Sequence, residues 1–73
     1  MFGRTKAVAP AVGDTFVKVS DGARHTWVVA KTFVHVDGLL HAVLHRHDQA
    51  RDTITVSVSA LEDADLFQRL PPV

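Results

Sequence analysis

The chain has 73 residues, no cysteine, and eight basic against eight acidic side chains, so its formal net charge is zero. This length predicts a single domain, and the lack of cysteine excludes both disulfide bonds and thiolate metal sites as sources of its stability. Apolar residues make up 47% of the chain, which argues against disorder, while the balanced charge argues against nucleic acid as a partner.

Residues 1–11 are predicted to form a flexible segment ahead of the domain. They contain a short Ala/Val stretch that Pro10 interrupts. Such a stretch is too short for the apolar core of a secretory signal, and far too short to span a bilayer. We therefore expect a cytoplasmic protein without membrane association, and the missing cysteines agree with a reducing compartment.

Two runs of β-branched residues predict the first two strands. Thr15–Ser20 ends at the turn signal Asp21-Gly22, and the next run, His25–Val36, contains neither glycine nor proline. This second run is dominated by Thr, Val, Trp and Phe, which are typical of strands. Because it is long for a single strand, we expect it to bend or bulge partway.

Asp37-Gly38 predicts a tight β-hairpin, since this dipeptide between apolar runs is the strongest short-range hairpin signal. A two-residue type I′ turn needs positive φ at both central positions, which glycine adopts freely and aspartate better than most residues. The run Leu39–His47 would then return antiparallel to the previous strand. In this register Val34 lies opposite His41.

This register divides the hairpin into a core face and an outer face. The core face is predicted to carry the larger apolar side chains, Trp27, Val29, Phe33, Leu40, Ala42 and Leu44. The outer face is predicted to carry the histidines His41, His45 and His47. Trp27 is therefore expected in the core rather than at a ligand-binding surface.

The spacing of two of these histidines would suit a shared metal ion. His45 and His47 are two residues apart on a strand, which places their Cα atoms roughly 6.8 Å from each other. Both imidazoles would then reach one Zn²⁺, Ni²⁺ or Cu²⁺, with Asp48 as a candidate third ligand. His41 lies roughly 13 Å from His45 and is not expected to join them. A structural zinc site normally has four ligands, so we expect solvent-facing histidines without a ligand, with a metal site at His45 and His47 as the alternative.

The remaining segments predict another strand, a helical turn and a closing strand. After a polar loop at His47–Asp52, the run Thr53–Ser59 has the cleanest period-two pattern in the chain and predicts the fourth strand. Ser59 and Glu62 have the spacing of a capping box, which predicts one short helical turn. Phe67–Leu70 is expected to form the closing strand, with the end of the helix as the alternative.

These elements predict an all-β fold of about five antiparallel strands with one short helical turn before the last strand. Short antiparallel strands close economically into a barrel, because closure removes exposed edges. The order of elements is that of a small SH3-like barrel over residues 12–70, followed by a tail at residues 71–73. An open antiparallel sheet with a terminal helix is the alternative.

Four short motifs of the chain resemble those of small bacterial SH3-like barrel proteins of the YodC type. They are Val12-Gly13-Asp14, Asp21-Gly22, His25-Thr26-Trp27-Val28-Val29 and Ser59-Ala60-Leu61. The chain departs from that type in one respect, because Trp27 lies on the second predicted strand and the third has no tryptophan. The resemblance implies the barrel fold and a bacterial source, and it implies no particular activity.

No catalytic signature accompanies these elements. The sequence contains no Gly-x-Ser-x-Gly, no phosphate-cradling glycine loop and no carboxylate-histidine cluster with metal spacing, so we predict neither an enzyme nor a bound cofactor. A core this small gains stability from burying a shared apolar edge or face. We therefore predict a non-catalytic protein-interaction module, with self-association included. The alternatives are a nucleic-acid-binding SH3-like barrel and a metal-binding protein that uses its surface histidines.

Overall fold

The computed structural model describes residues 9–71, which form five strands and one short helix. In chain order the elements are β1 (Thr15–Lys18), β2 (Thr26–Val34), β3 (Leu40–Arg46), β4 (Gln49–Ser57), α1 (Val58–Leu61) and β5 (Phe67–Arg69). The predicted all-β fold is confirmed, and so is the helical turn between the last two strands. The alternative of a helix that continues through residues 67–70 is wrong, because β5 pairs with β1 there.

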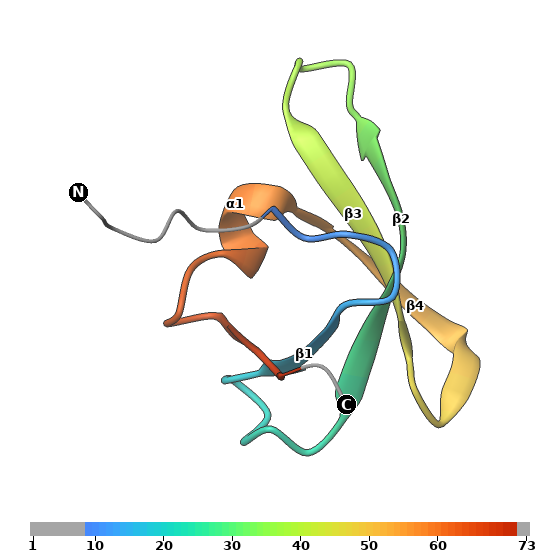
Figure 1. The fold of residues 1–73 in the computed structure, drawn as a ribbon, viewed down its shortest axis with the longest axis vertical. Coiled ribbons are helices and arrows are strands. Elements are labelled where there is room, and N and C mark those ends of the chain that lie inside the picture. The colour runs from blue at the N-terminus through green and yellow to red at the C-terminus, as the bar shows by residue number, and fades with distance from the viewer. Residues whose placement is uncertain (1–8, 72–73) are drawn as a thin grey trace.

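All five strands belong to one antiparallel sheet, in the order β4-β3-β2-β1-β5 (Figure 1). β4 and β5 are the two ends of this order, and within residues 9–71 they do not pair with each other. α1 packs against both of these end strands and against β3, so it lies between the two ends of the sheet. Closure of the sheet into a barrel stays a prediction.

One cluster of buried apolar side chains holds the sheet and the helix together. Its members are Phe16, Trp27, Val29, Ala42, Leu44, Val58, Leu61 and Phe67, with Ile54 and Val56 of β4 packed against it. The predicted core position of Trp27 is confirmed, since only 4% of this residue is exposed. The predicted face is wrong for Phe33. Leu40 shares the face of Ala42 and Leu44 as predicted, but it is 39% exposed and lies beyond the cluster.

A bulge at Ala30 explains why Phe33 does not enter the core. Val29 pairs with Leu44, whereas Lys31 pairs with the preceding residue of β3, Val43, so Ala30 is an extra residue between the two pairs. Side chains alternate between the faces of a strand, and one extra residue therefore reverses the faces beyond it. The bulge predicted for this long strand is confirmed, and it turns Phe33 to the outer face.

The β2–β3 hairpin forms, but its turn is not the predicted type I′. The His35 N–H donates to the Leu39 carbonyl at 2.9 Å, and the Gly38 N–H donates to the His35 carbonyl at 2.8 Å, so residues 36–38 form the loop. Gly38 has a φ of 82°, whereas Asp37 is not among the residues with positive φ. This is the three-residue connection in which a type I turn is followed by a left-handed glycine.

A carboxylate contact explains the choice of turn. Asp37 Oδ1 accepts a hydrogen bond from the Leu39 N–H at 2.9 Å, which holds the aspartate in an ordinary right-handed conformation. The longer loop shifts the pairing by one residue from the predicted register. Val34 lies opposite Leu40, and His41 lies opposite Phe33.

The connection between β3 and β4 is shorter than predicted. His47 and Asp48 form a two-residue turn, and Gln49 already pairs with Arg46 as the first residue of β4. The predicted polar loop at residues 47–52 is therefore wrong beyond Asp48. The pairing then skips to His45 opposite Thr53, which leaves residues 50–52 as an irregular bulged stretch at the start of β4.

Ser57 caps α1, two positions before the serine predicted from the capping-box spacing. Its hydroxyl accepts a hydrogen bond from the Ala60 N–H at 3.2 Å, and Glu62 lies at the C-terminal end of the helix. The prediction that Ser59 begins the helix is wrong. A start at Ser57 places Val58 and Leu61 in the core, and both are buried.

Most of the predicted flexible segment, residues 1–8, lies outside the described residues, as do Pro72 and Val73 of the predicted tail. The part of that segment that is described is tied to the domain. Pro10 is buried, and the Ala11 N–H donates to Asp14 Oδ2 at 2.9 Å. Within residues 9–71, no helix has the length and apolar character needed to cross a membrane.

Candidate functional site

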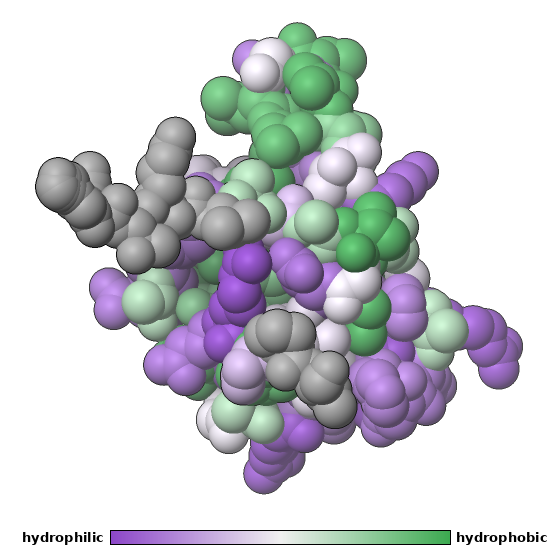
Figure 2. All heavy atoms as spheres, viewed as in Figure 1, coloured by the Kyte–Doolittle hydropathy of each residue, from purple (hydrophilic) through white to green (hydrophobic). Residues whose placement is uncertain are grey.

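The end of the β2–β3 hairpin carries exposed apolar side chains and projects beyond the rest of the domain (Figure 1). The four side chains are Val34, Val36, Leu39 and Leu40, and we call them the apolar hairpin end; their residues are 67%, 97%, 58% and 39% exposed. Figure 2 shows hydrophobic atoms gathered over this end, while much of the lower part of the same view is hydrophilic. Contiguous exposed apolar surface of this kind is typical of an interaction site.

Three rings form a second cluster on the outer face of the same hairpin. Phe33 and His41 are opposite each other, with ring centroids 5.8 Å apart. The His35 ring lies 4.9 Å from that of His41 and 6.3 Å from that of Phe33. We call these three residues the ring cluster. Sequence reasoning missed it because the predicted register placed His41 opposite a valine and away from Phe33.

Two polar contacts orient the histidines of the ring cluster. His41 Nδ1 lies 3.0 Å from the carbonyl oxygen of Leu39. A carbonyl only accepts hydrogen bonds, so in the neutral ring Nδ1 carries the proton and Nε2 presents a lone pair. His35 Nδ1 lies 3.7 Å from Asp37 Oδ1, and the side chains of both residues are 47% exposed. The histidines therefore combine fixed positions with access to solvent.

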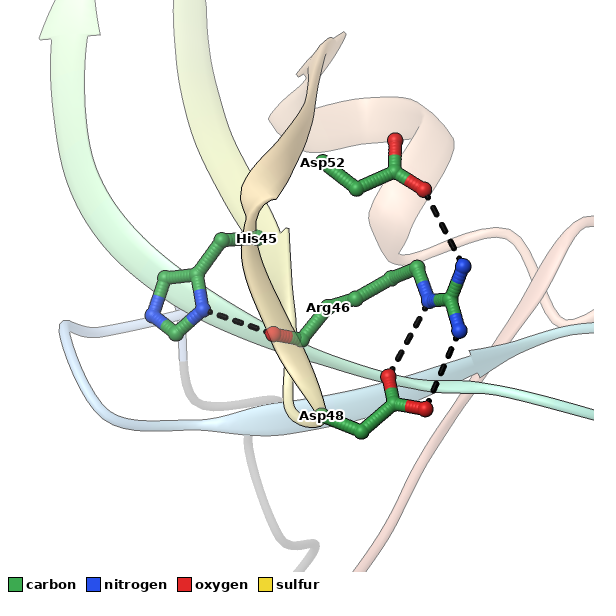
Figure 3. Close-up of polar contacts among 4 residues, drawn as sticks. All are labelled: His45, Arg46, Asp48 and Asp52. Carbon is green, nitrogen blue, oxygen red and sulfur yellow. Dashed lines mark hydrogen bonds and ion pairs between the residues drawn. The ribbon is translucent and has the colours of Figure 1, made fainter.

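A charged network lies at the opposite end of the hairpin, beside the β3–β4 turn (Figure 3). Arg46 donates two hydrogen bonds to Asp48, from Nε at 3.1 Å and from Nη2 at 3.0 Å. A third bond joins Arg46 Nη1 to Asp52 Oδ2 at 3.2 Å. The hydrogen bonds to Asp48 raise the pKa of Arg46, and those from Arg46 lower the pKa of Asp48. This network holds the turn and the irregular start of β4 together.

The two predicted metal ligands lie on either side of Arg46, in different surroundings. His45 belongs to β3, and its Nδ1 lies 3.0 Å from the Arg46 carbonyl oxygen (Figure 3). His47 is in the turn instead of on the strand, and its N–H donates to the Thr26 carbonyl at 2.8 Å. The strand spacing from which the pair was predicted therefore does not apply to His47. Metal binding by His45 and His47 stays a prediction.

Asp48, the candidate third ligand of that site, is held by Arg46. Both of its carboxylate oxygens accept hydrogen bonds from Arg46. Within residues 9–71, no group of three or more histidine and carboxylate side chains is arranged to hold a metal ion. The side chains of His47 and Asp48 line a shallow hollow of about 210 Å³ together with Arg24, His25 and Thr26. Sequence reasoning did not bring His25 into this group; it directly precedes β2, and Thr26 accepts the hydrogen bond from the His47 N–H.

Comparisons with protein-family models, curated proteins and solved structures find no match to this chain. The resemblance to YodC-type proteins stays a prediction. Two surfaces of the β2–β3 hairpin are exposed in the fold. These are the apolar hairpin end and the histidines of the outer face.

Proposed function

We propose that this chain is a non-catalytic interaction module of the bacterial cytoplasm, which self-associates through the β2–β3 hairpin. The observation that carries the proposal is the apolar hairpin end, where Val36 is 97% exposed. Leaving such side chains in water gives up roughly 25 cal/mol for each Å² that a partner could cover. A second copy of the chain offers the same apolar surface, and contact between two copies would bury both.

An unpaired strand edge supports a second copy as the partner. β1 pairs with β2 only as far as Val28, and the last hydrogen bond on that side joins the Gly13 N–H to Val29. From Lys31 onward, this edge of β2 has no neighbouring strand among residues 9–71. An unpaired edge is a template on which another strand can add, and two such edges can pair antiparallel around a twofold axis.

The backbone groups on this edge are identified by alternation along β2. The His35 N–H bonds to Leu39 across the hairpin. In an antiparallel ladder successive residues direct their N–H and C=O groups to opposite sides. Thr32 and Val34 therefore direct theirs away from β3 and toward the unpaired edge.

The charge of the chain also favours contact between copies. The formal net charge is zero, so two copies meet without long-range repulsion. Nucleic acid is not the partner we propose, because basic and acidic residues balance and Arg46 is paired with two carboxylates. A phosphate-binding surface would instead show an excess of positive charge on one face.

Sedimentation velocity over a range of concentrations tests this proposal on the full chain. We expect the wild type to sediment faster as its concentration rises, and Val36→Asp to remain monomeric because it places a charge in the apolar hairpin end. Leu66→Asp is the matched control, since Leu66 is 49% exposed and lies beside Val19, past the end of β1 that is remote from the apolar hairpin end. A wild type that stays strictly monomeric at high concentration would contradict the proposal.

A second variant tests the strand edge separately from the apolar side chains. Thr32→Pro removes an N–H that points away from β3, so the β2–β3 pairing should survive while edge pairing with a second copy is lost. Phe33→Pro removes an N–H that points toward β3 and should disrupt the hairpin itself. Self-association that persists in a folded Thr32→Pro variant would show that the edge takes no part.

A further inference from the structure

We infer that His35 and His41 form a binding site for a divalent transition-metal ion of the borderline class, such as Zn²⁺ or Ni²⁺. The two imidazoles come from opposite arms of the hairpin, and their ring centroids lie 4.9 Å apart. Imidazole nitrogen is a ligand that suits both of these ions. The site is distinct from the His45 and His47 pair, and it does not depend on self-association.

The separation of the rings matches that of two imidazoles bound to one ion. The zinc–nitrogen distance is about 2.0–2.1 Å. If the nitrogen–metal–nitrogen angle lies between the right angle of square-planar coordination and the tetrahedral angle, the two ring centroids are roughly 4.5 to 5.2 Å apart. The observed 4.9 Å lies within this interval. No comparable ring contact joins His45 and His47 among the described residues.

The hydrogen bond of His41 prepares that ring to bind a metal ion. Its Nδ1 lies 3.0 Å from the Leu39 carbonyl, so Nε2 is the nitrogen with the free lone pair. A histidine that ligates a metal through one nitrogen usually donates its other N–H to a carbonyl or a carboxylate, which fixes the orientation of the ring. The stacked ring of Phe33 further limits its movement.

Asp37 supplies negative charge beside the second ligand. Its Oδ1 lies 3.7 Å from His35 Nδ1 and is held in place by the Leu39 N–H at 2.9 Å. A cation at the two imidazoles would be attracted to this carboxylate. The pair provides two protein ligands, and the exposure of the His35 side chain leaves the other coordination positions to water. We therefore expect an open site that binds more weakly than a closed structural zinc site.

Isothermal titration calorimetry of the full chain with ZnCl₂ tests the inference. We expect one ion per chain, and a loss of affinity of more than about tenfold in both His35→Gln and His41→Gln. The matched control is the double variant His45→Gln/His47→Gln, which should bind as tightly as the wild type. Absence of saturable binding, or a loss of affinity only in the double variant, would overturn the inference.

A measurement on the unmodified chain guards against variants that do not fold. Ni²⁺ is paramagnetic when bound with open coordination, and it broadens the amide signals of residues near the site. In ¹H–¹⁵N spectra we expect broadening centred on residues 33–41, with much less at residues 45–47. Broadening centred instead on residues 45–47 would assign the ion to the pair predicted from the sequence and overturn the inference.

Discussion

Phe33 and His41 stack across the β2–β3 hairpin, with their ring planes tilted by 28°. Two local features produce this pairing. The bulge at Ala30 turns Phe33 outward, and the three-residue loop around Gly38 moves His41 into line with it. The same two features place His35 on the face of His41 and close to it, so they generate the ring cluster.

Side chains of the β2–β3 hairpin that lie in the core should contribute more to the stability of the domain than those near its loop. Leu44 has no exposed surface, whereas Leu40 on the same strand is 39% exposed and outside the core cluster. We expect Leu44→Ala to lower the free energy of unfolding by about 2–5 kcal/mol, while Leu40→Ala lowers it by less than about 1 kcal/mol. Urea unfolding followed by tryptophan fluorescence measures both. Equal losses in the two variants would contradict the position of the core.

The left-handed backbone at Gly38 should not tolerate an ordinary side chain. Its φ is 82°, and nothing lies within 4 Å of the position that a Cβ would take. The cost of Gly38→Ala is therefore conformational rather than steric, and we expect it to be about 1–2 kcal/mol. Gly38→Asn is the control, because asparagine adopts this conformation more readily. If alanine and asparagine were equally tolerated in chemical denaturation, the turn would have to be of another type.

Ser57 caps α1 and Ser59 does not, so alanine substitutions at the two serines should differ in their effect on stability. Ser57→Ala removes the acceptor for the Ala60 N–H and should cost about 0.5–2 kcal/mol of unfolding free energy. Ser59→Ala leaves that acceptor in place, so its effect should stay within about 0.5 kcal/mol. Thermal unfolding monitored by circular dichroism ranks the two variants. A larger loss at Ser59 would place the start of the helix where the sequence pattern predicts it.

Asp48 should make the stability of the fold depend on pH in the acid range. Its pKa is below the ordinary value of 3.8, because Arg46 donates hydrogen bonds to the carboxylate. A carboxyl whose pKa is lower in the folded chain stabilises the fold above its unfolded pKa. That contribution is lost as the pH falls through the folded pKa. The stability difference between wild type and Asp48→Asn should therefore be constant near neutral pH and shrink as the pH falls below 3.8.

Urea titrations at a series of pH values from neutral to acid measure this difference. Arg46→Lys is the informative control, since lysine keeps the positive charge but cannot form the two-pronged contact with the carboxylate. We expect the pH dependence to be reduced in that background. A stability difference for Asp48→Asn that stayed constant into the acid range would show that the contact does not shift the pKa of this carboxyl.

The sequence predicts the number, order and approximate bounds of the strands, because runs of β-branched residues separated by glycine turns carry that information locally. It does not predict the type of the β2–β3 turn. Asp37-Gly38 suits both a two-residue and a three-residue loop, and Gly38 has positive φ in each. The contact that decides between them, from the Leu39 N–H to Asp37, forms only once the loop is closed. The contact therefore determines whether Val34 pairs with Leu40, as observed, or with His41.

The candidate sites were predicted less well than the fold, because each depends on that register. The sequence indicates no role for His35, because the predicted register places its neighbour His41 opposite Val34. A bulge was predicted in β2, but its position at Ala30 follows from packing and not from any local pattern. The spacing that favoured His45 and His47 assumed a continuous strand, whereas His47 lies in the two-residue turn.

Ala30 separates β2 into two halves whose side chains alternate in opposite phase. Substitutions that change the size or charge of side chains after Ala30 would leave the packing of Trp27 and Val29, which precede it, undisturbed. Removing Ala30 would exchange the inward and outward positions throughout the distal half of β2 at once.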